Sequence, residues 1–238
     1  DNSGKVFGSS VGYAGDVNAD GYADLLIGQI SNNEHVDHGG KVYLVYGSGD
    51  VFSAEAFDNA IGWFSTIEDL YLGRMVSSAG DLNGDGFDDI VIGASNFSTD
   101  AASNAGALYL YYGKAKPLAG GNIADNDSWI YGTDYHNYIG DLVSFGHVDD
   151  DHFSDLVFSS FISPDNNHYG GEIYIQFGSK QHLNPTPTTE LLKYYRIEHR
   201  TDGIDRVGDI TVADLNGNGQ DDIIVVNPYI KQVQVKYN

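Results

Sequence analysis

Four nine-residue segments of the chain are built from aspartates, asparagines and glycines at fixed spacing. In the first, Asp16–Asp24, oxygen-bearing side chains stand at positions one, three, five and nine, and Gly21 stands at position six. A calcium ion takes about six to eight oxygen ligands, and alternate residues of a tightly turning loop can point inward to supply them. Glycine at position six permits the left-handed backbone that such a turn demands. The spacing therefore predicts a loop that binds Ca²⁺.

The candidate ligands are the side chains at positions one, three, five and nine and the backbone carbonyl at position seven, whose own side chain is free to be hydrophobic. Loop by loop, they are Asp16, Asn18, Asp20, Tyr22 and Asp24; Asp81, Asn83, Asp85, Phe87 and Asp89; Asp149, Asp151, Phe153 and Asp155; and Asp214, Asn216, Asn218, Gln220 and Asp222. The first two loops meet every requirement, so we predict strong sites there. The fourth offers only two carboxylates among its four side chains and should bind more weakly.

The third loop departs from the pattern at two positions. His147 stands at position one, where a ring nitrogen is a poor match for Ca²⁺, and His152 replaces the glycine, where a side chain resists positive φ. Asp150 is a possible substitute ligand. A weak calcium site and an ordinary acidic turn therefore both stay open for this loop.

Two other interpretations of the acidic loops can be weighed from the sequence. An EF-hand needs a bidentate Glu at position twelve and a helix on either side, whereas position twelve here falls in an apolar run, as Ile27, Ile92, Phe158 or Val225. Turns rich in Asp, Asn and Gly also join ordinary hairpins. Four such turns in register, each followed by the same apolar run, favour metal loops over ordinary turns for the first two.

The loops belong to units that repeat along the whole chain. Their first positions fall at 16, 81, 147 and 214, so the intervals are 65, 66 and 67 residues. Six to eight residues upstream of each loop stands an apolar residue followed by glycine, and a short apolar run follows each loop. These pairs and runs are Phe7-Gly8, Leu72-Gly73, Ile139-Gly140 and Val207-Gly208, and then 25–27, 90–92, 156–158 and 223–226. Short β-branched runs indicate strands buried on both faces.

Each unit contains further strand patterns. Apolar and polar or aromatic residues alternate over 41–47, 107–113, 172–178 and 232–237, which predicts strands with one packed and one wetter face. Another strand is expected over 63–67, 128–131 and 194–197. Four strands in each unit of about 65 residues, without helices, are typical of β-propeller blades.

The fourth unit stops at its third strand. We expect a single all-β propeller domain over residues 1–238, with repeats over approximately 1–68, 69–134, 135–200 and 201–238. Residues 1–6 are too short and polar to supply the missing strand, and an open sheet edge is an aggregation hazard. The chain is then either a four-bladed ring with a three-stranded closing blade or, as we favour, part of a larger ring.

The combined motifs resemble the FG-GAP repeat of integrin α-subunit propellers. The shared pattern is Phe-Gly, the loop Asp-x-Asn-x-Asp-Gly-x-x-Asp, the strand Ile-Val-Ile-Gly-Ala, and Gly-x-Val-Tyr-Leu-Val-Tyr-Gly. Glycosylphosphatidylinositol-specific phospholipase D carries similar repeats. The resemblance implies a propeller, seven-bladed in integrins, with Ca²⁺ in hairpin loops on one face and partner contacts on the other. The chain departs from the family in its third loop, in Ser95 where the family has proline, and in having four units.

Composition narrows the function further. The chain has 12 Lys and Arg against 34 Asp and Glu, a net charge of −22, which argues against a nucleic-acid partner. No apolar stretch reaches the roughly 18 to 20 residues of a membrane-spanning helix. The absence of Cys excludes disulfides and thiolate metal sites. Two sequons, at Asn96 and Asn126, are glycan acceptors if the chain is secreted.

Catalytic constellations are absent from the pattern. There is no nucleophile elbow and no phosphate-binding glycine loop, and 14 of the 34 acidic residues are Asp within the four loops. The segment His35-Val36-Asp37-His38 could hold a transition metal but is more simply an exposed loop between strands. We therefore expect a non-enzymatic protein.

Three functions fit these observations. The leading hypothesis is an extracellular or cell-surface calcium-binding module for adhesion or protein interaction, with structural metals and a protein or matrix ligand. A second is a structural subunit of an extracellular assembly or filament, completed by another chain. A third is a lectin-like propeller whose Trp and Tyr side chains stack on sugars, although core packing accounts for most of these aromatics.

Overall fold

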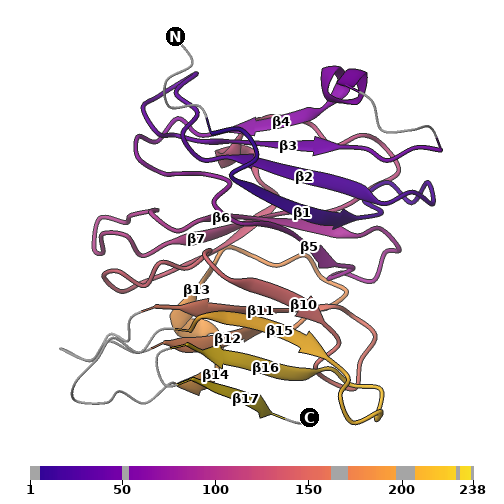
Figure 1. Ribbon diagram of the computed structural model, residues 1–238, viewed down its shortest axis with the longest axis vertical. Helices are drawn as coiled ribbons and strands as arrows, with labels where there is room; N and C mark the ends of the chain where they lie inside the picture. Colours follow the sequence, from indigo (N-terminus) through magenta and orange to yellow (C-terminus); the bar gives the residue numbers. More distant parts are fainter. Residues whose placement is uncertain (1–5, 50–53, 162–170, 197–206, 229–230, 237–238) are drawn as a thin grey trace.

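The computed structural model describes residues 6–49, 54–161, 171–196, 207–228 and 231–236. Within these ranges the chain is all-β, apart from three short 3₁₀ helices, η1 (Ala54–Asn59), η2 (Ile123–Asp125) and η3 (Thr188–Glu190). The strands form four sheets. The sheets lie in a row, with the first at one end and the fourth at the other (Figure 1). This arrangement confirms the predicted propeller blades, and the residues that the structure describes do not form a closed ring.

Each sheet is an antiparallel meander made by one repeat. The first contains β1 (Ser10–Gly15), β2 (Asp24–Gln29), β3 (Lys41–Val45) and β4 (Ile61–Phe64), and the second contains β5 (Val76–Gly80), β6 (Asp89–Ala94), β7 (Ala107–Tyr111) and β9 (Ser128–Tyr131). The third contains β10 (Val143–Gly146), β11 (Asp155–Ser160), β12 (Glu172–Gln176) and β14 (Leu192–Arg196). The described part of the fourth contains β15 (Asp209–Ala213), β16 (Asp222–Asn227) and β17 (Gln232–Lys236). Four strands per unit and a shorter last unit agree with the sequence pattern.

Two short strands close the outer edges of the first two sheets. β8 (Gly121–Asn122) belongs to the second repeat but pairs in parallel with β4 of the first sheet, and β13 (Thr186–Pro187) pairs in parallel with β9 of the second. The indole N–H of Trp63 donates to the carbonyl of Ala119, 3.1 Å away, beside the first of these pairings. The second and third repeats therefore each cover an edge of the preceding sheet, which protects backbone groups that would otherwise be unpaired.

The core consists of three hydrophobic clusters, each between two neighbouring sheets. One joins the first and second sheets around Trp63, Leu72 and Ile92. The next joins the second and third around Leu108 and Phe158, and the last joins the third and fourth around Val157, Ile210 and Val225. The innermost strands β1, β5, β10 and β15 also contact one another in sequence order. Sheet-on-sheet packing of this kind holds the row together.

Two predictions about the strands need correction. The alternating strands were expected to have a wetter face, but every residue of β7 is buried, as are the first four of β12. Both strands lie between two neighbouring sheets, so both of their faces pack. The strand expected over 63–67 is β4, which ends at Phe64, while Ser65 and Ile67 form a local turn through the Ser65 hydroxyl. Residues 197 and 237, at the ends of two other predicted strands, lie outside the described residues.

Candidate metal centres

The four acidic loops occupy equivalent places in the fold. Each joins the first strand of its sheet to the second, as β1 to β2 and β5 to β6 do. Backbone hydrogen bonds link neighbouring loops, so the loops lie along one side of the row (Figure 1). The apolar second strands β6 and β11 are buried along their whole length and fix the end of the second and third loops.

The first loop is folded by its own side-chain oxygens. The carboxylate of Asp16, at position one, accepts the backbone N–H groups of Asp20 and Gly21 at 3.0 and 2.8 Å. Asn18 accepts the N–H of Asp20 at 3.0 Å, and Asp20 accepts the N–H of Tyr22 at 2.9 Å. Gly21 has a φ of 89°, the left-handed turn expected at position six. The oxygens at positions one, three and five are thereby oriented by the turn that they stabilise.

The second loop repeats this network almost distance for distance. Asp81 accepts the N–H groups of Asp85 and Gly86 at 3.0 and 2.9 Å, and Gly86 has a φ of 90°. Asn83 accepts the N–H of Asp85 at 2.9 Å, and Asp85 accepts the N–H of Phe87 at 3.1 Å. Two loops that differ at four of their nine positions adopt one hydrogen-bond pattern, because the oxygen-bearing residues at positions one, three, five and nine are the same.

The fourth loop follows the same path with an amide, Asn218, in place of the carboxylate at position five. Asp214 accepts the N–H of Gly219 at 2.9 Å, and Asn218 accepts the N–H of Gln220 at 2.9 Å. These backbone N–H groups hold the pKa of Asp214 below its usual range. Asn216 donates its amide N–H to Asp222 at 3.2 Å. The loop has the shape of the first two with less negative charge, which agrees with the weaker site predicted for it.

The aspartate at position nine also makes backbone hydrogen bonds that the sequence did not reveal. In the first three loops its two oxygens accept backbone N–H groups from position two of the loop and from the glycine that follows the third strand. For Asp89 these donors are Leu82 and Gly113, both at 2.9 Å. For Asp155 they are Val148 and Gly178, at 2.8 and 3.0 Å. The same carboxylate therefore anchors the loop to the sheet, and in the third loop it also lies close to the other acids.

Burial makes these position-nine carboxylates reluctant to ionise. Burial raises the pKa of Asp89 to about 8, against the effect of its two backbone N–H partners, and the charges of Asp85 and Asp81 raise it further. Burial likewise raises the pKa of Asp155 to about 6 and raises the pKa of Asp24. A buried carboxylate among other carboxylates is an electrostatic arrangement that a bound cation would relieve.

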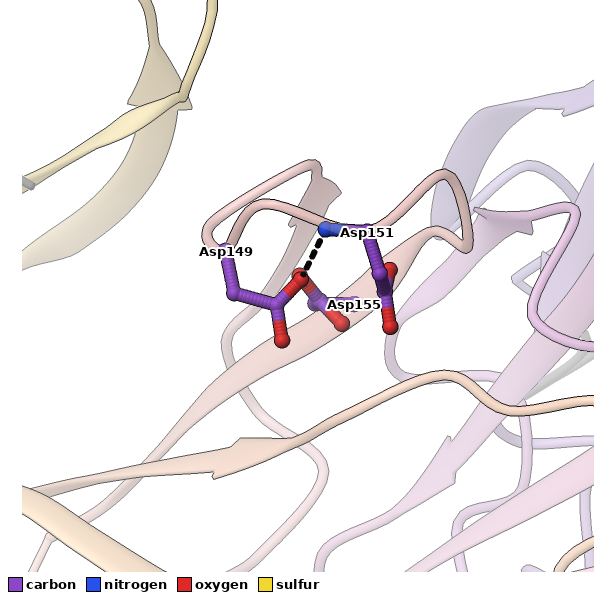
Figure 2. Close-up of side chains that lie close together, drawn as sticks. All are labelled: Asp149, Asp151 and Asp155. Atoms are coloured by element: carbon purple, nitrogen blue, oxygen red, sulfur yellow. Dashed lines mark hydrogen bonds between the residues drawn. The ribbon is translucent and has the colours of Figure 1, made fainter.

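The third loop gathers its acids most tightly. Ligand oxygens of Asp149, Asp151 and Asp155 all lie within 4.8 Å of one another. Figure 2 shows the three carboxylates side by side, with the N–H of Asp151 donating to Asp149 at 2.9 Å. The loop that departs most from the sequence pattern thus contains a compact carboxylate cluster. Three oxygen donors at this separation suit a hard divalent cation.

The two histidines of the third loop change its path. The ring Nδ1 of His147 lies 2.9 Å from the carbonyl oxygen of Phe153, which can only accept, so this nitrogen carries the proton. This carbonyl is the predicted position-seven ligand, and the ring nitrogen already occupies one of its lone pairs. His152 lacks the positive φ of the glycines at position six in the other loops. Asp150, the predicted substitute ligand, accepts instead from the side-chain amide of Gln220 in the fourth loop.

Neighbouring loops are joined at position eight, a connection that the sequence analysis missed. The N–H of Asp88 donates to the carbonyl of Asp16 at 3.2 Å, and its carboxylate accepts the N–H of Asp16 at 2.7 Å. Ser154 and Asp221 at position eight donate their N–H groups in the same way to position one of the preceding loop, at 3.0 and 2.6 Å. The sequence does carry a sign of this connection. A short polar residue stands at position eight of each loop whose preceding loop begins directly after a glycine.

The side chains of the other candidate features contact protein groups. His35 stacks on Phe64 at 3.6 Å between ring centroids, and His38 pairs with Asp69 at 2.9 Å, so 35–38 is a surface loop, as expected. At the second sequon, the amide nitrogen of Asn126 donates to the carbonyl of Ile123 at 3.0 Å. No helix in the described part of the chain is long and apolar enough to cross a membrane.

Comparison with known proteins agrees with this architecture. The model of the FG-GAP repeat matches residues 75–111, from the start of β5 to the end of β7. The chain is 30% identical to integrin alpha-4 of Xenopus laevis over 118 residues. This alignment covers 48% of this chain and 10% of that protein. It is 30% identical over 95 residues to integrin alpha-2 of Bos taurus, covering 37% of this chain and 7% of that protein.

A third relative is an enzyme. Phosphatidylinositol-glycan-specific phospholipase D of Bos taurus is 32% identical over 103 residues, which is 41% of this chain and 12% of that protein. The chain therefore spans about a tenth of the length of the curated relatives that it matches. Residues 75–111 of the second unit match the FG-GAP repeat, which confirms the resemblance drawn from the motifs. The relatives share the repeat rather than their full architecture.

Proposed function

We propose that this protein is a calcium-binding interaction module whose metal ions are structural. The observation that carries the proposal is the set of registered loops in which backbone N–H groups of the turn hold carboxylate and amide oxygens, together with the cluster of three carboxylates in the third loop. The metals would be held by the predicted ligands of the first, second and fourth loops and by the carboxylate cluster of the third. These donors are all oxygens, the ligand type that Ca²⁺ prefers over softer metals.

The loops fit a structural role because they join parts of the fold. Asp89 connects its loop to the end of the third strand through Gly113, and Asp88 connects the same loop to Asp16 of the preceding sheet. A cation in the second loop would neutralise charge at both connections. Metal binding should therefore stabilise the packing of neighbouring sheets as well as the loop itself. With free Ca²⁺ about tenfold above its dissociation constant, one site contributes about 1.4 kcal/mol.

The wider role follows from the resemblance to integrins. We propose that the module acts outside the cell or at its surface and binds a protein or matrix ligand without catalysis. The similarity to two integrin α subunits supports this assignment. The similarity to the phospholipase covers 12% of that enzyme, and those to the integrins cover 10% and 7% of those proteins, so the proposal rests on the shared repeat and includes no catalysis.

Sugar binding is a weaker candidate because of where the tryptophans lie. Trp63 is buried, and its ring packs against Tyr111 at 4.7 Å between centroids. Trp129 is half-buried and stacks on Tyr131 and Tyr109. Both indoles therefore serve core packing between the first two sheets, which leaves little indole surface for a glycan.

Calcium titration of the metal-free chain tests the proposal directly. We expect heat release on binding and a rise in the thermal midpoint when millimolar Ca²⁺ replaces chelator. The variant Asp85→Ala should lose one site, because it removes a side-chain ligand from the centre of the second loop. The variant Asp100→Asn removes an exposed carboxylate outside the loops and should behave like the parent chain. Equal calcium stoichiometry in all three proteins, or a midpoint that ignores chelator, would contradict the proposal.

A further inference from the structure

A pocket of about 430 Å³ opens between the second acidic loop, the third acidic loop and the segment that follows β12. The residues that line it include Asn83, Asp85, His152, Phe153, Lys180 and His182. Asp81 and Asp89 are not among its lining residues, so the pocket lies beside the predicted metal position of the second loop. Its volume falls within the range of about 300 to 1,000 Å³ that is usual for small-molecule sites.

Backbone hydrogen bonds show which residues of the preceding repeat are equivalent to the segment after β12. The N–H of Ser179 donates to the carbonyl of Leu82 at 2.8 Å, as the N–H of Lys114 donates to that of Val17 at 2.9 Å. Four residues later in each repeat, the N–H of a leucine donates to a tyrosine hydroxyl, at 2.7 and 2.9 Å. Residues 179–183 therefore correspond to residues 114–118.

Three nitrogen-bearing side chains distinguish this pocket from the equivalent place between the first and second loops. Lys180 and His182 stand where the second repeat has alanine and proline, and His152 stands where the second loop has Gly86. Alanine, proline and glycine have no side-chain hydrogen-bond donor. The polar lining is therefore a property of this junction and not of the repeat in general.

His182 is held in the pocket wall by contacts on its ring face and its ring edge. Its ring stacks on Tyr112 with 3.9 Å between centroids and 18° between planes. Its Nε2 lies 3.4 Å from the side-chain amide nitrogen of Asn83, which can only donate. The amide oxygen of Asn83 accepts the N–H of Asp85, which fixes the orientation of that amide. Nε2 is therefore the acceptor, so Nδ1 of His182 carries the proton and is a donor.

Phe153 supplies an apolar part of the wall. A Cβ added to Gly84 would lie 2.5 Å from a ring carbon of Phe153, so the ring packs directly against the backbone of the second loop. Phe153 is only half-buried by this contact, and it also lines the pocket. An aromatic face of this kind can stack on an apolar surface of a ligand.

The polar lining combines donors with acceptors. Lys180 only donates, the carboxylate of Asp85 only accepts, and a neutral imidazole does one of each. A net charge of −22, with acidic loops on both sides of the pocket, opposes an anionic ligand. The ammonium group of Lys180 opposes a cationic ligand. The lining therefore suits a neutral ligand whose own groups both donate and accept, which is a property of hydroxyl groups.

We propose that this pocket binds a neutral sugar, as a monosaccharide or as the end of a short glycan chain. Sugar hydroxyls bond to Lys180 and to the two imidazoles, and the C–H face of a sugar ring stacks on Phe153. This surface is separate from the two tryptophans, whose packing limits their own access to glycans. Neither Lys180 nor His182 is a predicted metal ligand, so the proposal goes beyond the structural role of calcium.

Binding of the 238-residue chain to an array of neutral, sialylated and sulfated glycans tests the class of ligand. We expect the chain to bind neutral glycans. The smallest neutral glycan that binds is then titrated by calorimetry against the parent chain and the double variant Lys180→Ala and His182→Pro. The double variant should bind about tenfold more weakly, because it loses two hydrogen-bond donors. Binding of no neutral glycan, recognition of acidic glycans alone, or equal affinity of the double variant and the parent overturns the proposal.

The variants are matched to the fold. Alanine and proline are native at the equivalent positions, as Ala115 and Pro117, so the double variant should keep the thermal midpoint and the calcium stoichiometry of the parent. Lys116→Ala removes an exposed lysine of the equivalent segment, outside the pocket, and should bind sugar like the parent.

The single variant Lys180→Ala keeps the test decisive if the double variant melts at a lower temperature. It leaves the ring of His182 stacked on Tyr112 and should weaken sugar binding about threefold, through the loss of one donor. Affinity equal to that of the parent in this variant also overturns the proposal.

Discussion

The pKa of Asp89 predicts an unusual pH dependence for the metal-free protein. Burial raises this pKa from 3.8 to about 8 in the folded state, so between these values the folded chain holds one more proton than the unfolded chain. Stability from a raised pKa is complete below the unfolded value and is lost as the pH rises through the folded one. One extra proton over three pH units corresponds to about 4 kcal/mol between pH 5 and pH 8.

The assay is urea unfolding of the chain at pH 5 and pH 8, in chelator and in calcium. The net charge of −22 also destabilises the folded state as the pH rises, so the informative quantity is the difference from Asp89→Asn. This variant cannot ionise at position 89. Most of the additional fall in stability between pH 5 and pH 8 should therefore be absent from it. Calcium should restore the parent chain most strongly at pH 8, because the ion neutralises the carboxylates there. If the parent chain and Asp89→Asn lose equal stability between pH 5 and pH 8 in chelator, the reasoning is refuted.

Four further variants follow from the packing and the loops. Gly93→Ala should cost several kcal/mol in urea unfolding, because its Cβ would lie 2.1 Å from a backbone oxygen of the third repeat; Gly86→Ala, in open space at positive φ, should cost only about 1 to 2 kcal/mol. Trp63→Ala should cost about 3 to 5 kcal/mol in the same assay, because the side chain is fully buried. The double variant His147→Asp and His152→Gly gives the third loop the full pattern, so titration calorimetry should show tighter calcium binding there; unchanged binding would mean that the histidines do not limit the site.

The spacing of the loop oxygens could be predicted because it is a local property. Asp16, Asn18 and Asp20 orient their oxygens by bonding to N–H groups two to five residues away, and such contacts depend only on the turn. The strands were predictable for a similar reason, since each apolar run pairs with the strand that follows it. Local rules of this kind need no knowledge of neighbouring units.

Most of the missed features depend on residues far apart in the sequence. The second oxygen of Asp155 finds Gly178, 23 residues away, and this contact exists only once the third strand has formed. The exposure of β7 was misjudged because its two neighbouring sheets come from other repeats. His147 looked unfavourable for the third loop, and its bond to the Phe153 carbonyl could not be foreseen without the path that His152 imposes on the turn. Alternation in one strand says which residues share a face, and other units decide whether that face is covered.

The parallel pairings of β8 and β13 determine when the outer edges of the first two sheets can be covered during synthesis. A nascent chain completes β4 at Phe64, yet the strand that seals its outer rim, Gly121–Asn122, is translated more than fifty residues later. The rim of the second sheet waits in the same way for Thr186–Pro187. Partly synthesised chains therefore expose an unpaired strand edge in the crowded surroundings of the ribosome. Truncations that end just before either short strand should be the forms most prone to aggregate.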